Sequence, residues 1–458
     1  MNLEEEIRVI NNPQEFVDLC NTIFTEKYGD DFQIIDGTRA DDGNDGYVYS
    51  EKRIFAIYCP VKPENKRDED FKKKIGGDLN KAKELQDTGK EIKKWTFITP
   101  CKLSNGVISY LIEKAKEFNL EANQLESAFL AGELYKHQHL LSKFPRLHIS
   151  QIEPKLDEIL KELRGSKDIV ELPNKPYTQK NEKPSEDLKK VFEILSIEQT
   201  EKSKSELKVI FYKTSDKIAQ VNAILGLLKW SDLLEDKDED MVDWCDQGMK
   251  IAEILKDKGL RAIFLSNKAF HLSRIWSRED MNTAYTLKAG NLIGIQVILE
   301  EQVQRKIKML HDLETQFLSA FKEALDITIE IKNGYLIAQI LLNIGQAAGG
   351  RYIHLNVLKI SRAEQEKRLS KEALLQAKNL YSSMGYELGV GYALHNLANQ
   401  LFTFGEKEEA MQLNKTVTEI AKKHNDGSLL QTASWLRESL ETDRIPDYIH
   451  GERRERRK

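Results

Sequence analysis

Cysteine is scarce and long apolar runs are missing from this sequence, and each absence excludes a class of protein. The 458 residues contain four cysteines, at positions 20, 59, 101 and 245, with no paired spacing. Scattered cysteines argue against a disulfide framework or a zinc cluster and favour a reducing compartment. No apolar run approaches the roughly 20 residues of a membrane-spanning helix, and the acidic start MNLEEEIRVI lacks the features of a signal peptide. We therefore predict a cytoplasmic protein with no membrane partner.

A strong charge of one sign is also missing. The net charge of −5 gives no global argument for nucleic-acid binding, although a local basic groove would be compatible with it. Apolar residues make up 40% and charged residues 31% of the chain, as in a folded protein. The length predicts two or three domains rather than one core.

Residues 1–165 alternate between helix and strand patterns. Asn12 and Pro13 predict the start of a helix that ends at Gly29. The run IFAIYC carries no polar alternation, which is typical of a strand covered on both faces by helices. The order predicts a mixed α/β domain, with strands at 32–35, 47–49, 54–59 and 95–99 and helices at 13–28, 71–85 and 106–118.

The stretch Asp41–Pro60 concentrates the residues that could carry chemistry. It joins a loop of acids and glycines to apolar strands, and Asp45 stands at the entry of the second strand. Asp41 and Asp42 have an equally good interpretation as turn residues. Downstream, Gly76-Gly77-Asp78 is interpreted as a helix start capped by Asp78, with a metal ligand as the alternative.

The order of elements resembles the restriction-endonuclease-like nuclease core of the PD-(D/E)XK type. In that family an Asp begins the second strand, and a carboxylate-x-Lys triplet follows on the third. Asp45 matches the first position. The triplet position falls on Tyr58-Cys59-Pro60. Tyr58 and Pro60 keep the spacing of two that places side chains on one face of a strand, but they replace the carboxylate and the lysine.

The resemblance implies metal-dependent phosphodiester hydrolysis with Mg²⁺ or Mn²⁺. Asp45 would supply one carboxylate ligand, with Glu26 as one source of a second. Asp78 and Glu64 are the other sources of that second carboxylate, and Lys62 or Lys81 would stand in for the missing lysine that orients the attacking water. The catalytic candidates are Asp45, Asp78, Lys62 and Lys81, and the candidate metal ligands are Asp45, Asp78 and Glu64.

Two further groups of residues are given structural interpretations. The lysines of Lys72–Lys74 indicate a solvated helix face, with a phosphate-neutralising rim as the alternative. His137 and His139 lie two apart on a predicted helix and would point to different faces, so no metal is expected between them.

Residues 166–187 are predicted to be a linker, because Pro173, Pro176 and Pro184 stand among polar residues. From 188 to 445 the apolar residues have helical spacing, and part of the pattern repeats. Ala324–Ile327 is followed by Asn343–Gly345. Ala377–Leu380 is followed at the same distance by Asn396–Ala398. Residues 446–458 form a charged tail. The segment Gly349–Arg351 is predicted to break a helix.

The best copy, Leu394–Ala410, resembles the tetratricopeptide repeat (TPR). Its small residue Ala398 and turn residue Gly405 stand where that repeat places such residues. The resemblance implies a curved solenoid that binds a protein or peptide. A plain helical bundle is the alternative.

Two functions follow from these resemblances. The first is a nuclease-like effector controlled by, or targeted through, a TPR-like partner-binding domain, as in bacterial antiviral defence. The alternative is a non-catalytic adaptor whose degenerate nuclease core binds nucleic acid or protein while the repeats recruit a partner or peptide signal. Pro60 favours the adaptor, and the acids around Asp45 favour the nuclease. DNA versus RNA and homo-oligomerisation stay open.

Overall fold

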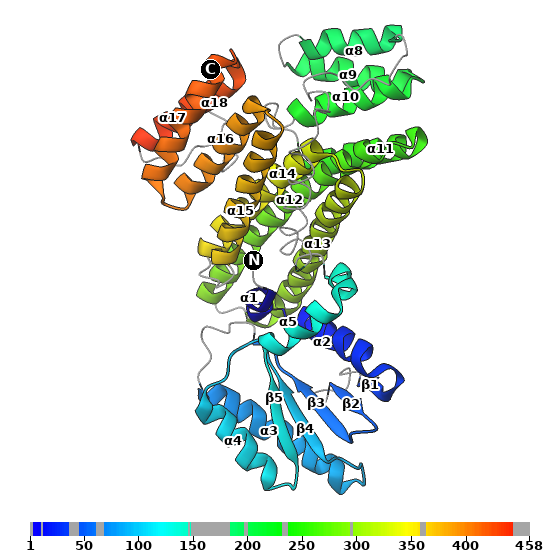
Figure 1. Ribbon diagram of the computed structural model, residues 1–458, viewed down its shortest axis with the longest axis vertical. Helices are drawn as coiled ribbons and strands as arrows, with labels where there is room; N and C mark the ends of the chain where they lie inside the picture. Colours follow the sequence, from blue (N-terminus) through cyan, green and yellow to red (C-terminus); the bar gives the residue numbers. More distant parts are fainter. Residues whose placement is uncertain are drawn as a thin grey trace. The chain divides into compact units, whose positions relative to one another are not determined.

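The computed structural model describes residues 3–10, 12–35, 45–60, 68–144, 147, 184–196, 200–230, 237–293, 296–357 and 363–442 (Figure 1). These residues fall into two compact units, one ending at residue 147 and the other beginning at residue 184. The first unit contains a mixed sheet and the second is all-helical, which confirms the predicted α+β class. The predicted tail and most of the predicted linker lie outside the described residues.

A five-stranded mixed sheet organises the first unit. The strands lie in chain order; the first three are antiparallel and the last three parallel. They are β1 (Phe32–Ile34), β2 (Gly46–Val48), β3 (Arg53–Ile57), β4 (Lys94–Ile98) and β5 (Glu121–Leu125). The start of β2 therefore lies at the same edge as the carboxyl ends of β3, β4 and β5, the edge where ligands bind in open α/β sheets.

Helices cover both faces of this sheet (Figure 1). Phe55 and Ile57 of β3 pack into one core with α1, α2 and α5, while Ile54 and Ala56 pack into another with α3 and α4. This alternation explains why the strand has no polar face. The helices are α1 (Leu3–Arg8), α2 (Pro13–Tyr28), α3 (Asp68–Asp87), α4 (Asn105–Lys116) and α5 (Ser127–Lys136), with short 3-10 turns η1 (Gly29–Asp31) and η3 (Gln138–Lys143).

The start of α2 forms as its sequence predicts. The Asn12 side-chain oxygen accepts hydrogen bonds from the backbone N–H groups of Gln14 at 2.9 Å and Glu15 at 3.2 Å. These bonds satisfy two of the donors that a helix start leaves without intrahelical partners. The cap fixes the first turn of the helix that carries one wall of the site described below.

Eleven helices make up the described part of the second unit. Consecutive helices pack together, and α12 also contacts α14, α14 contacts α16 and α16 contacts α18. Such next-but-one contacts are compatible with a solenoid of stacked hairpins. The helices are α8 (Glu186–Ser196), α9 (Glu201–Lys213), α10 (Lys217–Trp230), α11 (Asp238–Leu255), α12 (Lys258–Ile293), α13 (Gln296–Glu330), α14 (Gly334–Val357), α15 (Ala363–Ser383), α16 (Glu387–Thr403), α17 (Lys407–Lys423) and α18 (Gly427–Thr442). None of the described helices is long and apolar enough to cross a membrane.

The turns after α15, α16 and α17 repeat one backbone geometry. Gly385, Gly405 and Asn425 have φ of +69°, +81° and +51° and stand 20 residues apart. After each, the next N–H bonds to a carbonyl five residues back, at 2.8–2.9 Å, which is the Schellman helix end. Gly405 thus occupies a turn as predicted. The 20-residue spacing gives a helix pair of about 40 residues, longer than the TPR's ordinary 34.

The prediction that Gly349–Arg351 breaks a helix is wrong, because α14 runs through it. A Cβ on Gly349 would lie 1.9 Å from the Gln400 side-chain oxygen, so this glycine allows α16 to approach closely. Arg351 is 2% exposed, and its Nη2 donates to Glu366 Oε2 at 2.6 Å. Packing and a buried ion pair keep the segment helical despite the low propensity of two adjacent glycines.

Gly345→Ala is expected to lower the free energy of unfolding of the second unit by about 1–3 kcal/mol. The added Cβ would lie 2.6 Å from Leu374 Cγ and 3.2 Å from the Ser370 carbonyl oxygen of α15. Gly350→Ala is the matched control, since a Cβ there meets nothing within 4 Å and should stabilise α14 by up to about 1 kcal/mol. Urea unfolding followed by circular dichroism measures both; equal effects would contradict this packing of α14 on α15.

The buried His395 of α16 is expected to make the stability of the helical unit depend on pH. Burial lowers the pKa of this side chain from 6.5 to about 4, so the unfolded chain takes up a proton at a higher pH than the folded one. Stability is therefore lost as pH falls from about 6.5 to about 4, by up to about 3 kcal/mol. Unfolding between pH 7 and 4 should show a smaller loss for His395→Gln. Equal losses in both proteins would contradict the assignment.

Candidate functional site

Asp45 joins three strands at the carboxyl edge of the sheet. Its backbone N–H donates to the Phe55 carbonyl at 2.9 Å, and its carbonyl accepts from the Ile35 N–H at 3.2 Å. Its side-chain Oδ2 accepts from the Ile57 N–H at 2.6 Å. Backbone and side chain are thus both fixed by neighbouring strands. The carboxylate has the rigid support that a ligand-binding group needs.

Helix α3 supplies a second carboxylate and a lysine. Lys74 Nζ lies 2.9 Å from Asp78 Oδ1, one turn along the helix, and Asp78 is only 3% exposed. The same ammonium lies 5.8 Å from the centre of the Tyr58 ring, just beyond the end of β3. Tyr58 packs against Phe71 and Phe97, with ring centres 5.9 and 6.1 Å apart. The lysine therefore lies between the carboxylate of α3 and the end of β3.

Electrostatics link these groups to Asp45. Burial raises the pKa of the Asp45 carboxyl above its ordinary value. The Ile57 N–H and the Lys74 charge act in the opposite direction, and the Asp78 charge raises the pKa further. Asp45, the residue before β2, and Asp78 and Lys74 of α3 are thus near enough for their charges to interact. Pairs of carboxylates that raise each other's pKa occur often at functional sites.

Asp78 does not cap a helix start, so that prediction is wrong. It lies in the middle of α3, which begins at Asp68. The preceding Gly76 has a packing role instead: a Cβ there would lie 2.8 Å from the Tyr110 hydroxyl of α4. The alternative interpretation of Asp78, as a metal ligand, stays open.

The predicted strand 54–59 is shorter in the structure, where β3 ends at Ile57. Tyr58 still donates its N–H to the Ile98 carbonyl at 2.8 Å. Cys59 Sγ lies 3.3 Å from the Ile10 carbonyl oxygen, and burial raises the pKa of its thiol to about 12. Neither Tyr58 nor Cys59 supplies the acid or the lysine of the family's triplet.

The structure brings together only some of the predicted site residues. Lys62 and Glu64 lie outside the described residues. Lys81 is half-buried on α3, but the lysine whose charge acts on Asp45 is Lys74. The sequence indicates a solvated helix face or a phosphate rim for the lysine patch that contains Lys74. The signal that could have identified it is its spacing of four residues before Asp78, which pairs side chains on a helix.

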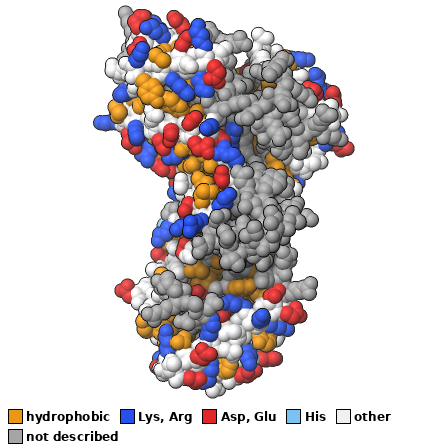
Figure 2. Space-filling view, turned by 180° about the vertical axis from the view of Figure 1, so that it is seen from behind, with side chains coloured by type: hydrophobic (Ala, Val, Ile, Leu, Met, Phe, Trp, Pro, Cys, Tyr) orange, Lys and Arg blue, Asp and Glu red, His pale blue; other side chains and the backbone are white. Residues whose placement is uncertain are grey.

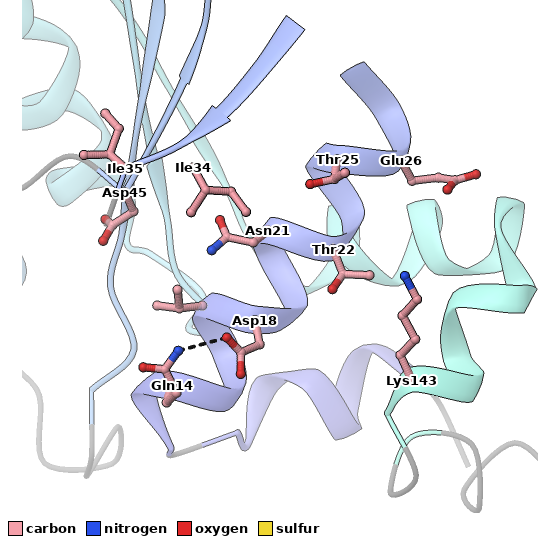
Figure 3. Close-up of a pocket in the computed structure, with 11 residues that line it drawn as sticks. Gln14, Asp18, Asn21, Thr22, Thr25, Glu26, Ile34, Ile35, Asp45 and Lys143 are labelled. Atoms are coloured by element: carbon pink, nitrogen blue, oxygen red, sulfur yellow. Dashed lines mark hydrogen bonds between the residues drawn. The ribbon is translucent and has the colours of Figure 1, made fainter. Parts of the chain in front are cut away.

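A groove of about 770 Å³ opens beside Asp45 (Figure 3). One wall is α2, and β1 with the residue after it contributes Ile34 and Ile35. Asp45 and Lys143 lie on opposite sides of the view. The lining residues are Gln14, Val17, Asp18, Asn21, Thr22, Thr25, Glu26, Ile34, Ile35, Asp45 and Lys143.

His137 and His139 do not point apart, which corrects the prediction. Helix α5 ends at Lys136, so neither histidine lies within it. His137 Nδ1 lies 3.5 Å and His139 Nε2 3.4 Å from Glu26 Oε1, on the groove-lining face of α2. The sequence carries no glycine or proline at this helix end to show where the histidines leave the helix.

The described residues contain no group of three or more His, Cys, Asp or Glu side chains that could hold a metal ion. Two carboxylates are sufficient for Mg²⁺, which keeps several water ligands and binds substrate phosphates directly. No known family model matches the sequence, and no curated protein matches it.

Asp45→Asn is expected to raise the free energy of unfolding at pH 7 in the absence of divalent cations. The raised pKa means that the charged carboxylate costs stability above its ordinary titration range, whereas asparagine can still accept the Ile57 hydrogen bond. The gain should vanish as pH falls below about 4. Urea unfolding in chelator at several pH values tests this, with exposed Asp30→Asn in η1 as the control. Destabilisation of Asp45→Asn at pH 7 would contradict the electrostatic account.

Proposed function

We propose that the first unit is a nuclease-like module that cleaves phosphodiesters, and that the helical unit binds a protein or peptide that controls or targets it. The observation that carries the proposal is the Lys74–Asp78 ion pair of α3, which lies near enough to the Asp45 carboxyl, at the carboxyl edge of the sheet, for both charges to act on it. This set of groups resembles the paired acids and lysine of PD-(D/E)XK nucleases. Here the second acid and the lysine come from α3 rather than from the third strand.

The residues fit a hard divalent cation. Asp45 and Asp78 offer carboxylate oxygens. Burial and, to a smaller extent, the Asp78 charge raise the pKa of Asp45, and a cation would offset this unfavourable negative charge. Asp45 and Asp78 would hold the ion. Bound Mg²⁺ or Mn²⁺ supplies Lewis-acid polarisation of the phosphate and activation of water.

The chain's own residues orient the reaction. The Ile57 N–H fixes the Asp45 carboxylate, and Lys74 holds Asp78 in place at 2.9 Å. The ammonium of Lys74 also provides a positive charge near the point where negative charge develops on the phosphate. Pre-positioned charge of this kind lowers the barrier to phosphoryl transfer.

A second candidate function has its own support. Tyr58 and Pro60 occupy the positions of the family's acid and lysine, and Lys74 already neutralises Asp78. On the face shown in Figure 2, acidic and basic side chains interleave over the described residues rather than forming one broad basic surface. A non-catalytic adaptor, in which the degenerate core binds nucleic acid or protein, would have these features.

Cleavage of labelled single- and double-stranded DNA and RNA in Mg²⁺ or Mn²⁺ tests the proposal. The full chain should cut at least one substrate, and chelator should abolish cutting. Asp45→Asn, Asp78→Asn and Lys74→Met should each lower the rate by about 100-fold or more. Lys83→Met is the matched control on the same helix, because Lys83 pairs with Asp87 at the end of α3, and its rate should stay within a few-fold of the original protein.

Two results would reject the nuclease assignment. The first is no cutting of any substrate with either cation, both alone and after addition of candidate partners captured by the helical unit. The second is cutting that survives in Asp45→Asn and Asp78→Asn. Circular dichroism of every variant separates a lost activity from a lost fold.

A further inference from the structure

The ammonium of Lys74 occupies the carboxylate that the proposed cation site needs. Its Nζ lies 2.9 Å from Asp78 Oδ1, and the Asp78 side chain is buried. Asp78 would have to offer the same carboxylate to a divalent ion. Two positive charges at one buried carboxylate repel each other strongly, because little water lies between them to weaken the repulsion. Lys74 is therefore a counter-ion of Asp78 that competes with a divalent cation.

Lys74 can leave this carboxylate without disturbing the core. Its side chain is 34% exposed, and its four-carbon stem is flexible. The Tyr58 ring offers a second place for the ammonium, because the ring centre lies 5.8 Å from Lys74 Nζ. An aromatic face attracts an ammonium within about 6 Å of its centre. A lysine that leaves Asp78 can thus stay beside the site instead of entering solvent.

The Tyr58 ring is itself held in place by other rings. Phe71 of α3 lies edge-on to it at 5.9 Å, and Phe97 of β4 lies at 6.1 Å between ring centres. Tyr58 directly follows Ile57, whose N–H fixes the Asp45 carboxylate. A neutral ring attracts the lysine without forming an ion pair, whereas an acid at this position would bind it through full opposite charges. The replacement of the acid by Tyr58 therefore suits a lysine that has to move.

We propose that Tyr58 is a positioning residue that acts through Lys74. Its ring receives the Lys74 ammonium when the lysine gives up Asp78 to a divalent cation, and it keeps that positive charge near Asp45. The inference rests on the proposed function for the cation and the phosphate. Lys74 then has two opposite effects, since it competes with the cation but assists the reaction. Loss of Lys74 should tighten cation binding and slow cleavage together.

Electron paramagnetic resonance of Mn²⁺ titrated into the full chain measures the affinity of the cation without substrate. Lys74→Met should bind Mn²⁺ at least about 10-fold more tightly than the original protein, because the competing charge is gone. Tyr58→Leu should bind it about 2- to 5-fold more weakly, because the displaced ammonium loses the ring. Tyr58→Phe keeps the ring and should keep the original affinity. Lys83→Met, which removes a lysine paired with Asp87, is the control and should not change the affinity.

Combining the two changes separates this role from a merely structural one. In a Lys74→Met background, Tyr58→Leu should no longer affect Mn²⁺ affinity, because no ammonium remains to be placed. Leucine retains an apolar side chain against Phe71 and Phe97, and circular dichroism checks that every variant is folded. A Tyr58→Leu effect of the same size in both backgrounds would overturn the positioning role.

Other outcomes also decide the inference and separate it from the proposed function. Equal Mn²⁺ affinity of Lys74→Met and the original protein would overturn the competition, and equal weakening by Tyr58→Phe and Tyr58→Leu would overturn the role of the ring. No Mn²⁺ binding even in Lys74→Met would overturn both the inference and the cation site. Cleavage in a protein that lacks the expected affinity changes would reject the inference alone. The expected changes in a protein that cuts nothing would support the inference and reject the nuclease.

Discussion

The hydrogen bond from the Ile57 N–H to Asp45 Oδ2 is the constraint on which the proposed site depends. It ties the side chain at the start of β2 to the end of β3, the strand that leads the parallel half of the sheet. A carboxylate held by its own sheet loses little freedom when it binds a ligand. Burial by the same packing raises its pKa. Asp45 therefore combines a rigid carboxylate with a raised pKa, a combination that occurs often at functional sites.

The helical unit depends on a different constraint, the close approach of helices at small residues. A side chain at Gly345 would clash with Leu374, and one at Gly349 with Gln400. Regularly spaced left-handed turns at Gly385, Gly405 and Asn425 reverse the chain after each helix. The helices also make next-but-one contacts, which are compatible with a stacked array. Such an array is a common scaffold for holding an extended partner.

Local patterns in the sequence predict much of this fold. The cap at Asn12, the uninterrupted apolar run of β3 and the turn at Gly405 each follow from short-range chemistry, and the structure has them. Predictions failed where tertiary packing overrode a local signal. Gly76 and Gly349 carry the local signal of a helix end, yet each lies within a helix against a neighbouring side chain. Within the lysine patch only Lys74 stands four residues before a carboxylate, Asp78. Its effect on Asp45, which is distant in sequence, depends on the fold. Likewise, the groove residues of α2 and Lys74 of α3 approach Asp45 from opposite faces of the sheet, which depends on which face each helix covers.

The most direct test of the central claim is whether Asp45 and Asp78 hold one cation. Electron paramagnetic resonance of Mn²⁺ titrated into the full chain counts bound ions without requiring activity or a partner. The account predicts one site that is displaced by Mg²⁺ and lost in both Asp45→Asn and Asp78→Asn, but kept in Asp18→Asn. Mn²⁺ binding that is absent in the original protein, or unchanged in both variants, would contradict it.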